Sequence, residues 1–179
     1  MDPALTWTLI AALSLLFAAS AAMKFADVGQ FAAAVENYRI LPPALAAATA
    51  WMIPALEALA AAGLLLPAAR AGAAWLAAAL LALFTAAIAI NLARGRRDID
   101  CGCFGAALRQ QLSGWLVARN AVLLLAVAVA ALPAHLRALG AVDLVTITFG
   151  AATLATLYAS MNYLAASVPW IRELKSIHA

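Results

Sequence analysis

Hydrophobic residues fill five long stretches of this chain, and the polar residues gather in the segments between them. A helix of about 20 residues, rising about 1.5 Å per residue, crosses the roughly 30 Å hydrocarbon layer of a membrane. Each stretch is close to that length, so the pattern predicts an all-α integral membrane protein, a bundle of about five transmembrane helices. The predicted helices are Leu5–Met23, Ala44–Leu66, Ala71–Leu92, Trp115–Leu132 and Val142–Ala166.

The connections between these helices differ in length and polarity. Residues 27–43, after the first helix, mix apolar and charged side chains, which predicts a short amphipathic helix at the membrane surface that ends before Pro42. Residues 93–114, before the fourth helix, form a polar loop that holds both cysteines of the chain. The tail of that loop, residues 106–112, is predicted to form another short surface helix, with Ser113 capping the helix that follows. The two remaining connections are short and predict antiparallel hairpins.

Composition agrees with this class of protein. Of the 179 residues, 68% are hydrophobic and 11% are charged, whereas a soluble domain has about 25% charged residues. The polar surface is too small to face water on all sides, so we expect the lipid bilayer to cover most of the bundle. Alanine is abundant, and its small side chain permits close helix packing. No repeat or linker divides the chain, and residues 1–179 are expected to form a single membrane domain.

Basic residues are distributed unevenly between the two ends of the predicted bundle. Eight Lys and Arg residues flank the end with the cysteine loop and two flank the other end, leaving out Arg119 inside the fourth helix. The positive-inside rule then predicts an outside N-terminus and a cytoplasmic cysteine loop. The first apolar stretch lacks the basic segment of a cleaved signal and is expected to stay as a helix. No basic patch with interleaved aromatic residues occurs, which excludes nucleic acid as the expected partner.

The two cysteines lie one residue apart, in the segment Asp-Cys-Gly-Cys-Phe-Gly at positions 100–105. A disulfide between Cys101 and Cys103 would close almost no loop and would contribute little to stability. Strained, exposed disulfides of this kind exchange readily. Arg94 and the N-terminus of the fourth helix favour the thiolate form, while Asp100 opposes it. The pattern therefore predicts a redox-active pair with Cys101 and Cys103 as the catalytic residues.

Two other interpretations of the cysteines stay open. Free cysteine packs well in apolar cores, so the pair could be structural. A metal site would need further ligands for tetrahedral zinc, and the only histidines, His135 and His178, lie far along the chain. No metal is therefore expected.

Buried polar residues make a second candidate feature. Glu57 lies in the middle of a predicted transmembrane helix, three residues after Pro54, where a lone carboxylate is costly. We expect it to be protonated, paired or directed into an internal cavity. Polar residues of other helices approach the same end of the bundle, beneath the cysteines. The predicted supporting cluster comprises Lys24, Glu57, Asn91, Arg94, Arg119 and Asn120.

Two interpretations of this cluster stay open as well. In the structural one, Glu57 forms an ion pair with Lys24 or Arg119 that only fixes the register of the helices. In the functional one, the cluster tunes the thiols, relays a proton or binds a polar head group such as a quinone ring. Asn162, in the last predicted helix, is expected to make a helix–helix hydrogen bond.

Short motifs spread over roughly residues 5 to 135 resemble the MauE family, the methylamine-utilisation membrane proteins related to DoxX-like proteins. The cysteine hexapeptide is the most specific of them, and the last predicted helix carries none. Tyr38, Arg39 and Pro42 belong to an interfacial motif. The motifs are Lys24-Phe25-x-Asp27, Tyr38-Arg39-Ile40-Leu41-Pro42, Pro54-x-x-Glu57, Asn91-x-x-Arg94-Gly95, the hexapeptide Asp100-Cys101-Gly102-Cys103-Phe104-Gly105, and Arg119-Asn120.

The resemblance implies a multi-pass protein of the bacterial inner membrane that acts with a thioredoxin-like redox partner. It also implies support for maturation of the disulfide-rich small subunit of methylamine dehydrogenase. That substrate matures outside the cytoplasm, which is at odds with the cytoplasmic cysteine loop that the charge count predicts.

The main interpretation is a membrane thiol–disulfide oxidoreductase that needs no certain cofactor. A quinone-linked disulfide oxidase, with Arg119 behind the cysteine pair, is the nearest alternative and would bind a quinone. A non-redox scaffold or chaperone, and a small-molecule transporter suggested by Pro54 and Glu57, are alternatives from other functional classes.

Overall fold

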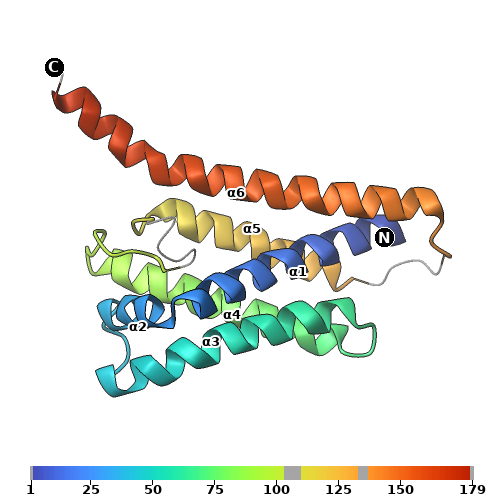
Figure 1. The fold of residues 1–179 in the computed structure, drawn as a ribbon, viewed down its shortest axis with the longest axis horizontal. Helices are drawn as coiled ribbons and strands as arrows, with labels where there is room; N and C mark the ends of the chain where they lie inside the picture. The colour runs from blue at the N-terminus through green and yellow to red at the C-terminus, as the bar shows by residue number, and fades with distance from the viewer. Residues whose placement is uncertain (1, 103–109, 133–136, 178–179) are drawn as a thin grey trace.

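The computed structural model describes residues 2–102, 110–132 and 137–177, with side chains described as far as residue 167. Within these residues the chain forms six helices, and its only extended pairing is an isolated bridge between Asp100 and Gln111 (Figure 1). The helices are α1 (Pro3–Ala26), α2 (Val28–Asn37), α3 (Pro43–Leu65), α4 (Arg70–Ala93), α5 (Gly114–Ala130) and α6 (Ala141–Ile177).

Side-chain caps and prolines fix where the first helices begin. The Asp2 carboxylate accepts a hydrogen bond from the Ala4 N–H at 2.8 Å at the start of α1. Asp27 ends α1 and caps α2, because its carboxylate accepts from the Gln30 N–H at 2.8 Å. Pro43 stands at the first position of α3, where its missing N–H costs nothing. These local signals turn the chain sharply from α1 into α2 and then into α3.

Among the described residues, four helices are long and apolar enough to cross a membrane: α1, α3, α4 and the part of α6 from Ala141 to Ser167. This criterion rests on length and composition, and it identifies a multi-pass membrane protein. The predicted all-helical fold is confirmed. The fifth predicted span corresponds to α5, which is apolar but has 17 residues. A fifth crossing of the bilayer therefore stays a prediction.

Helix α1 lies at the centre of the packing. It contacts α3, α5 and α6, while α4 packs between α3 and α5. Helix α6 runs along the outside of the bundle against α1, and only 6% of its apolar stretch is buried (Figure 1). Small residues permit the close contacts, since a Cβ added to Gly63 of α3 would lie 2.8 Å from the Cβ of Ala73 in α4. The broad apolar face of α6 is left to lipid or to a partner.

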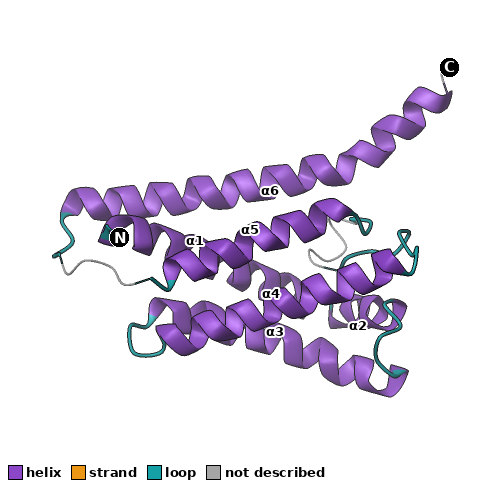
Figure 2. Cartoon of the chain, turned by 180° about the vertical axis from the view of Figure 1, so that it is seen from behind, coloured by secondary structure: helices purple, strands orange, loops and turns teal. Residues whose placement is uncertain are grey.

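The predicted short amphipathic helix is present as α2. Phe31 and Ala34 on one face are buried, and much of the opposite face is exposed. Helix α2 packs against α3 and lies at the end of the bundle where α4 finishes and α5 begins (Figure 2). The segment with the cysteines is attached at this same end.

The tail of the cysteine loop differs from the expectation. Part of the short helix predicted over residues 106–112 lies outside the described residues, but residues 110–112 are extended rather than helical. The Cys101 N–H donates to the Gln110 carbonyl at 2.8 Å, and the Leu112 N–H donates to the Ile99 carbonyl at 3.1 Å. Backbone groups of residues 110–112 thus pair with residues 99–101 and are not available for the hydrogen bonds of a helix. Ser113 is the N-cap of α5 as predicted, although its side chain makes no capping hydrogen bond.

Candidate functional site: a buried ion pair beneath the cysteine loop

A buried ion pair joins α1 to α3. The Lys24 ammonium lies 2.5 Å from Oε1 of Glu57, and the two side chains are 1% and 2% exposed. Lys24 also donates to the Ser20 hydroxyl at 2.6 Å, and that hydroxyl donates to the same Glu57 oxygen at 3.1 Å. The sequence allowed either Lys24 or Arg119 as the ion-pair partner of Glu57, and in the structure the partner is Lys24. Ser20 lies one helical turn before Lys24, and this i, i+4 spacing could have identified it.

Arg119 of α5 makes hydrogen bonds to Asn162 of α6 and to its own neighbour Asn120 instead. Its Nη1 donates to Oδ1 of Asn162 at 2.7 Å, and Nε and Nη2 donate to the side-chain oxygen of Asn120 at 3.3 and 3.1 Å. The guanidinium also lies over the ring of Tyr158, 5.6 Å from its centroid. The helix–helix hydrogen bond expected of Asn162 is therefore present, with Arg119 as the donor.

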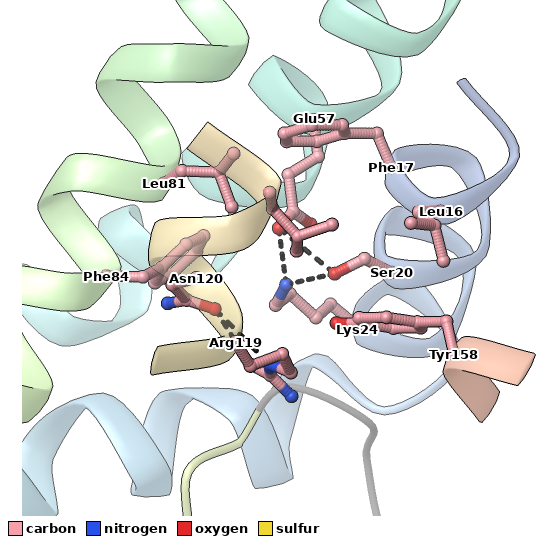
Figure 3. A pocket seen from close by; sticks show the side chains of 11 residues that line it. Leu16, Phe17, Ser20, Lys24, Glu57, Leu81, Phe84, Arg119, Asn120 and Tyr158 are labelled. Carbon is pink, nitrogen blue, oxygen red and sulfur yellow. Dashed lines mark hydrogen bonds and ion pairs between the residues drawn. The ribbon is translucent and has the colours of Figure 1, made fainter. Parts of the chain in front are cut away.

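A cavity of about 60 Å³ lies between the Lys24–Glu57 pair and Arg119, and we call it the interior cavity. Side chains of α1, α3, α4, α5 and α6 line it. Figure 3 shows Glu57, Lys24 and Ser20 directed toward one another, with the guanidinium of Arg119 beside the amide of Asn120. Oε2 of Glu57 is buried and makes no hydrogen bond to the described residues. The polar residues that line the interior cavity are Ser20, Lys24, Glu57, Arg119, Asn120 and Tyr158.

Asn91 and Arg94, which the sequence placed in the same cluster, lie away from the interior cavity. Asn91 is fully buried in the last turn of α4, donates to the Ala87 carbonyl at 3.1 Å and accepts from Arg96 at 3.3 Å. Arg94 donates to the backbone carbonyl of Arg39 at 3.3 Å. Asn91 thus links the Arg96 side chain to α4, and Arg94 links the end of α4 to the turn after α2.

The interfacial motif contacts the cysteine segment directly. The Tyr38 hydroxyl donates to the Cys101 carbonyl at 3.2 Å. Burial, together with the nearby Asp100 carboxylate, raises the pKa of the Tyr38 phenol above its ordinary value, so the group stays a hydrogen-bond donor. Arg39 adopts a positive φ of 49° in the turn that follows, and Pro42 is the N-cap of α3.

Cys101 itself is held in an apolar setting. It is 7% exposed and belongs to a cluster with Ile88 of α4, with Leu112 just before α5 and with Leu116 in the first turn of α5. Cys101 is not a free thiol but is disulfide-bonded. Cys103 lies outside the described residues. No group of three or more metal-ligating side chains occurs among the described residues.

The cysteine segment rests on α2 at Gly102. This residue has a φ of +67°, and a Cβ added to it would lie 2.9 Å from the Cβ of Ala34, so both the conformation and the close approach require glycine. A groove of about 20 Å³, which we call the loop groove, opens beside this contact and is lined in part by Lys24, Phe31, Asp100 and Gly102. Of the described residues, Lys24 alone lines both the loop groove and the interior cavity.

The fold and the site together define a class: multi-pass helical membrane proteins that carry a cysteine loop on a short amphipathic helix, above a buried lysine–glutamate pair. The family model described as "Methylamine utilisation protein MauE" matches residues 2–133, and the chain belongs to this family. The match covers α1 to α5, and therefore the cysteine segment and the ion pair.

Relatives with the same description extend the similarity into α6. The chain is 43% identical over 164 residues to the methylamine utilization protein MauE of Paracoccus versutus, which covers 91% of this chain and 88% of the relative. It is 43% identical over 171 residues to that of Paracoccus denitrificans, covering 94% and 88%, and 46% identical over 125 residues to that of Methylorubrum extorquens, covering 70% and 67%. No solved structure matches the chain.

Proposed function

We propose that this protein is a thiol–disulfide oxidoreductase of the bacterial inner membrane, in which Cys101 and Cys103 exchange a disulfide with a thioredoxin-like partner. The observation that carries the proposal is the setting of Cys101: a disulfide-bonded residue in a segment braced by Tyr38 and α2, directly above a buried charge pair. The relatives are named for methylamine utilization. The partner's final substrate is accordingly the disulfide-rich small subunit of methylamine dehydrogenase.

The exchange proceeds in two balanced steps. A thiolate of the partner attacks one sulfur of the disulfide, which forms a mixed disulfide and breaks the bond between Cys101 and Cys103. The second thiolate of the partner then attacks the mixed disulfide. Two electrons have passed from the partner to this protein, so the partner leaves as a disulfide and this protein is left as a dithiol. The same steps in reverse reduce the partner.

The burial of Cys101 supports a division of roles between the two sulfurs. Cys101 is 7% exposed and surrounded by the aliphatic side chains of Ile88, Leu112 and Leu116. These side chains shield the Cys101 sulfur from an incoming partner thiolate. Cys103 is therefore the sulfur that is attacked, and Cys101 is the leaving and resolving sulfur.

Trapping of the mixed disulfide tests this function. Purified, reduced protein in lipid nanodiscs is incubated with the oxidised thioredoxin-like protein of the same pathway, so that a free thiolate can attack the partner's disulfide. The mixture is quenched with acid and separated without reductant. Cys101→Ser should accumulate a covalent adduct at Cys103, whereas Cys103→Ser should give little adduct. Ser113→Ala is a matched control, because Ser113 flanks the loop and its side chain makes no capping hydrogen bond.

Growth on methylamine as the nitrogen source provides the second part of the test. A strain that carries the Cys101→Ser/Cys103→Ser double variant should lose active methylamine dehydrogenase. Wild-type growth of that strain would contradict the redox function and select the scaffold interpretation.

The quinone-linked alternative receives no support from the interior cavity. An aromatic ring the size of benzene occupies a cavity of about 150 Å³, and the interior cavity has about 60 Å³.

A further inference from the structure

Lys24 stands between the interior cavity and the loop groove. On one side its ammonium contacts Glu57, and on the other its side chain lines the loop groove beside Asp100 and Gly102, the two neighbours of Cys101. The ring of Phe31 lies 5.3 Å from the Lys24 ammonium, and the same ring lies beside Gly102. The one buried cation of α1 is therefore within the same contact network as the cysteine segment.

Glu57 lines the interior cavity, and one of its carboxylate oxygens makes no hydrogen bond to the described residues. Its Oε1 accepts both hydrogen bonds, from Lys24 and from Ser20, while Oε2 is buried without a partner among the described residues. A buried carboxylate oxygen of this kind requires a donor, which is either a water molecule or a proton of its own. At about 30 Å³ per water molecule in the liquid, the cavity of about 60 Å³ accommodates about two water molecules.

The acidic residues near Lys24 on the loop side already have donors. Asp100 accepts from the backbone N–H groups of Gly102 at 3.3 Å and Gln110 at 3.2 Å, and Asp27 caps α2. On the cavity side the charged or titratable neighbours of the pair are Arg119 and Tyr158. Glu57 is thus the carboxylate that depends on Lys24, and a new anion at Cys101 would compete for the same cation.

We propose that Glu57 takes up a proton, through water in the interior cavity, when the disulfide of Cys101 is reduced, and that Lys24 then becomes the counter-ion of the Cys101 thiolate. This inference rests on the proposed thiol–disulfide function. The balance is complete: a partner dithiol gives two electrons and two protons and becomes a disulfide. One proton goes to the Cys103 sulfur and the other to Glu57, while Cys101 is left as the thiolate. The net charge of the site does not change.

Redox-difference infrared spectroscopy of the full chain in lipid nanodiscs tests the proposal, with dithiothreitol as the reductant. The reduced-minus-oxidised spectrum should show a new carboxyl C=O band that shifts to lower frequency in D2O. Glu57→Gln should remove this band and Glu57→Asp should move it, so a carboxyl-bearing variant remains should the first one fail to fold. Lys24→Gln should abolish the ultraviolet thiolate absorbance of the reduced protein.

Ser14→Ala is the matched control. Ser14 lies on α1, is buried, and its hydroxyl donates to the Ala61 carbonyl of α3 at 2.8 Å, so it links the same two helices without charge. This variant should keep both the carboxyl band and the thiolate absorbance. A structural perturbation of the α1–α3 contact alone would therefore not reproduce the result.

The possible failures are distinguishable. If dithiothreitol releases no thiols from the wild-type protein, the proposed exchange is wrong and this inference falls with it. If thiols are released but no carboxyl band appears, or the band survives unchanged in both Glu57 variants, the redox function stands and the proton uptake by Glu57 is refuted.

Discussion

Replacement of Lys24 by methionine should destabilise the folded protein by about 3–4 kcal/mol. Breaking a buried ion pair by removing one partner costs about 3–5 kcal/mol, because the other charge is left uncompensated. Of the donors that the structure describes, the remaining Glu57 carboxylate would keep only the Ser20 hydroxyl, at 3.1 Å. A carboxyl group can escape this penalty by binding a proton. For a group with an ordinary pKa of about 4.3, this costs about 3.7 kcal/mol at pH 7, which sets the upper end of the expected range.

The double variant Lys24→Met/Glu57→Leu should be much less affected. Both charges are gone, and the site is surrounded by apolar side chains such as Phe17, Leu81 and Phe84. Replacing a whole buried pair by apolar residues of similar volume is often neutral or stabilising, so we expect a loss within about 1 kcal/mol. The interaction between the two positions is then of the order of several kcal/mol.

Reversible unfolding in mixed detergent micelles measures these free energies, with helical circular dichroism as the signal and Ser14→Ala as the uncharged control. The reasoning is refuted if the losses of unfolding free energy in Lys24→Met and in Glu57→Leu add up to the loss in the double variant within about 0.5 kcal/mol, the value expected of independent sites. It is also refuted if Lys24→Met unfolds at the wild-type detergent fraction.

Three further predictions concern the cysteine segment and α6. Gly102→Ala should destabilise the loop by about 1–3 kcal/mol because of its positive φ, and Ala34→Gly should restore part of the loss by relieving the 2.9 Å contact; thermal unfolding measures both. Tyr38→Phe removes a hydrogen bond worth about 0.5–1.5 kcal/mol and should speed alkylation of reduced Cys101 several-fold in mass-tag assays. Asn162→Leu removes the acceptor at 2.7 Å that ties α6 to α5, so limited proteolysis should release α6 earlier; unchanged cleavage would contradict that role.

The positions of the helices could be predicted because the bilayer imposes a length on every apolar segment. The second predicted span, Ala44–Leu66, is observed as Pro43–Leu65, and the third, Ala71–Leu92, as Arg70–Ala93. The short amphipathic helix was predictable for a similar local reason, since Asp27 provides a cap and Phe31 and Ala34 share one face. In each case the information lies within a few residues of the element itself.

The arrangement around the cysteines could not be predicted in the same way, because it depends on contacts between distant segments. Residues 110–112 were expected to be helical, but their backbone pairs with residues 99–101. From the sequence, either Lys24 or Arg119 could form an ion pair with Glu57. The rotation of α5 about its axis, which directs Arg119 to Asn162, cannot be read from local sequence. Asn91 in the last turn of α4 and Arg94 at its C-cap make hydrogen bonds to Ala87, Arg96 and Arg39, and neither lines the interior cavity.

The course of the chain around α1 explains why one buried charge pair can affect Cys101 at the end of the bundle. Lys24 and the Asp27 cap lie within one turn at the end of α1, so any shift of that turn moves α2 with it. Helix α2 in turn supports Gly102 through Ala34 and leads into Tyr38, which binds the Cys101 carbonyl. A change in the charge on Glu57 that releases or retains Lys24 therefore acts on the same turn that positions the disulfide. Because this coupling needs only the local contacts of α1, α2 and α3, it should persist in Asn162→Leu, in which α6 has lost its hydrogen bond to α5.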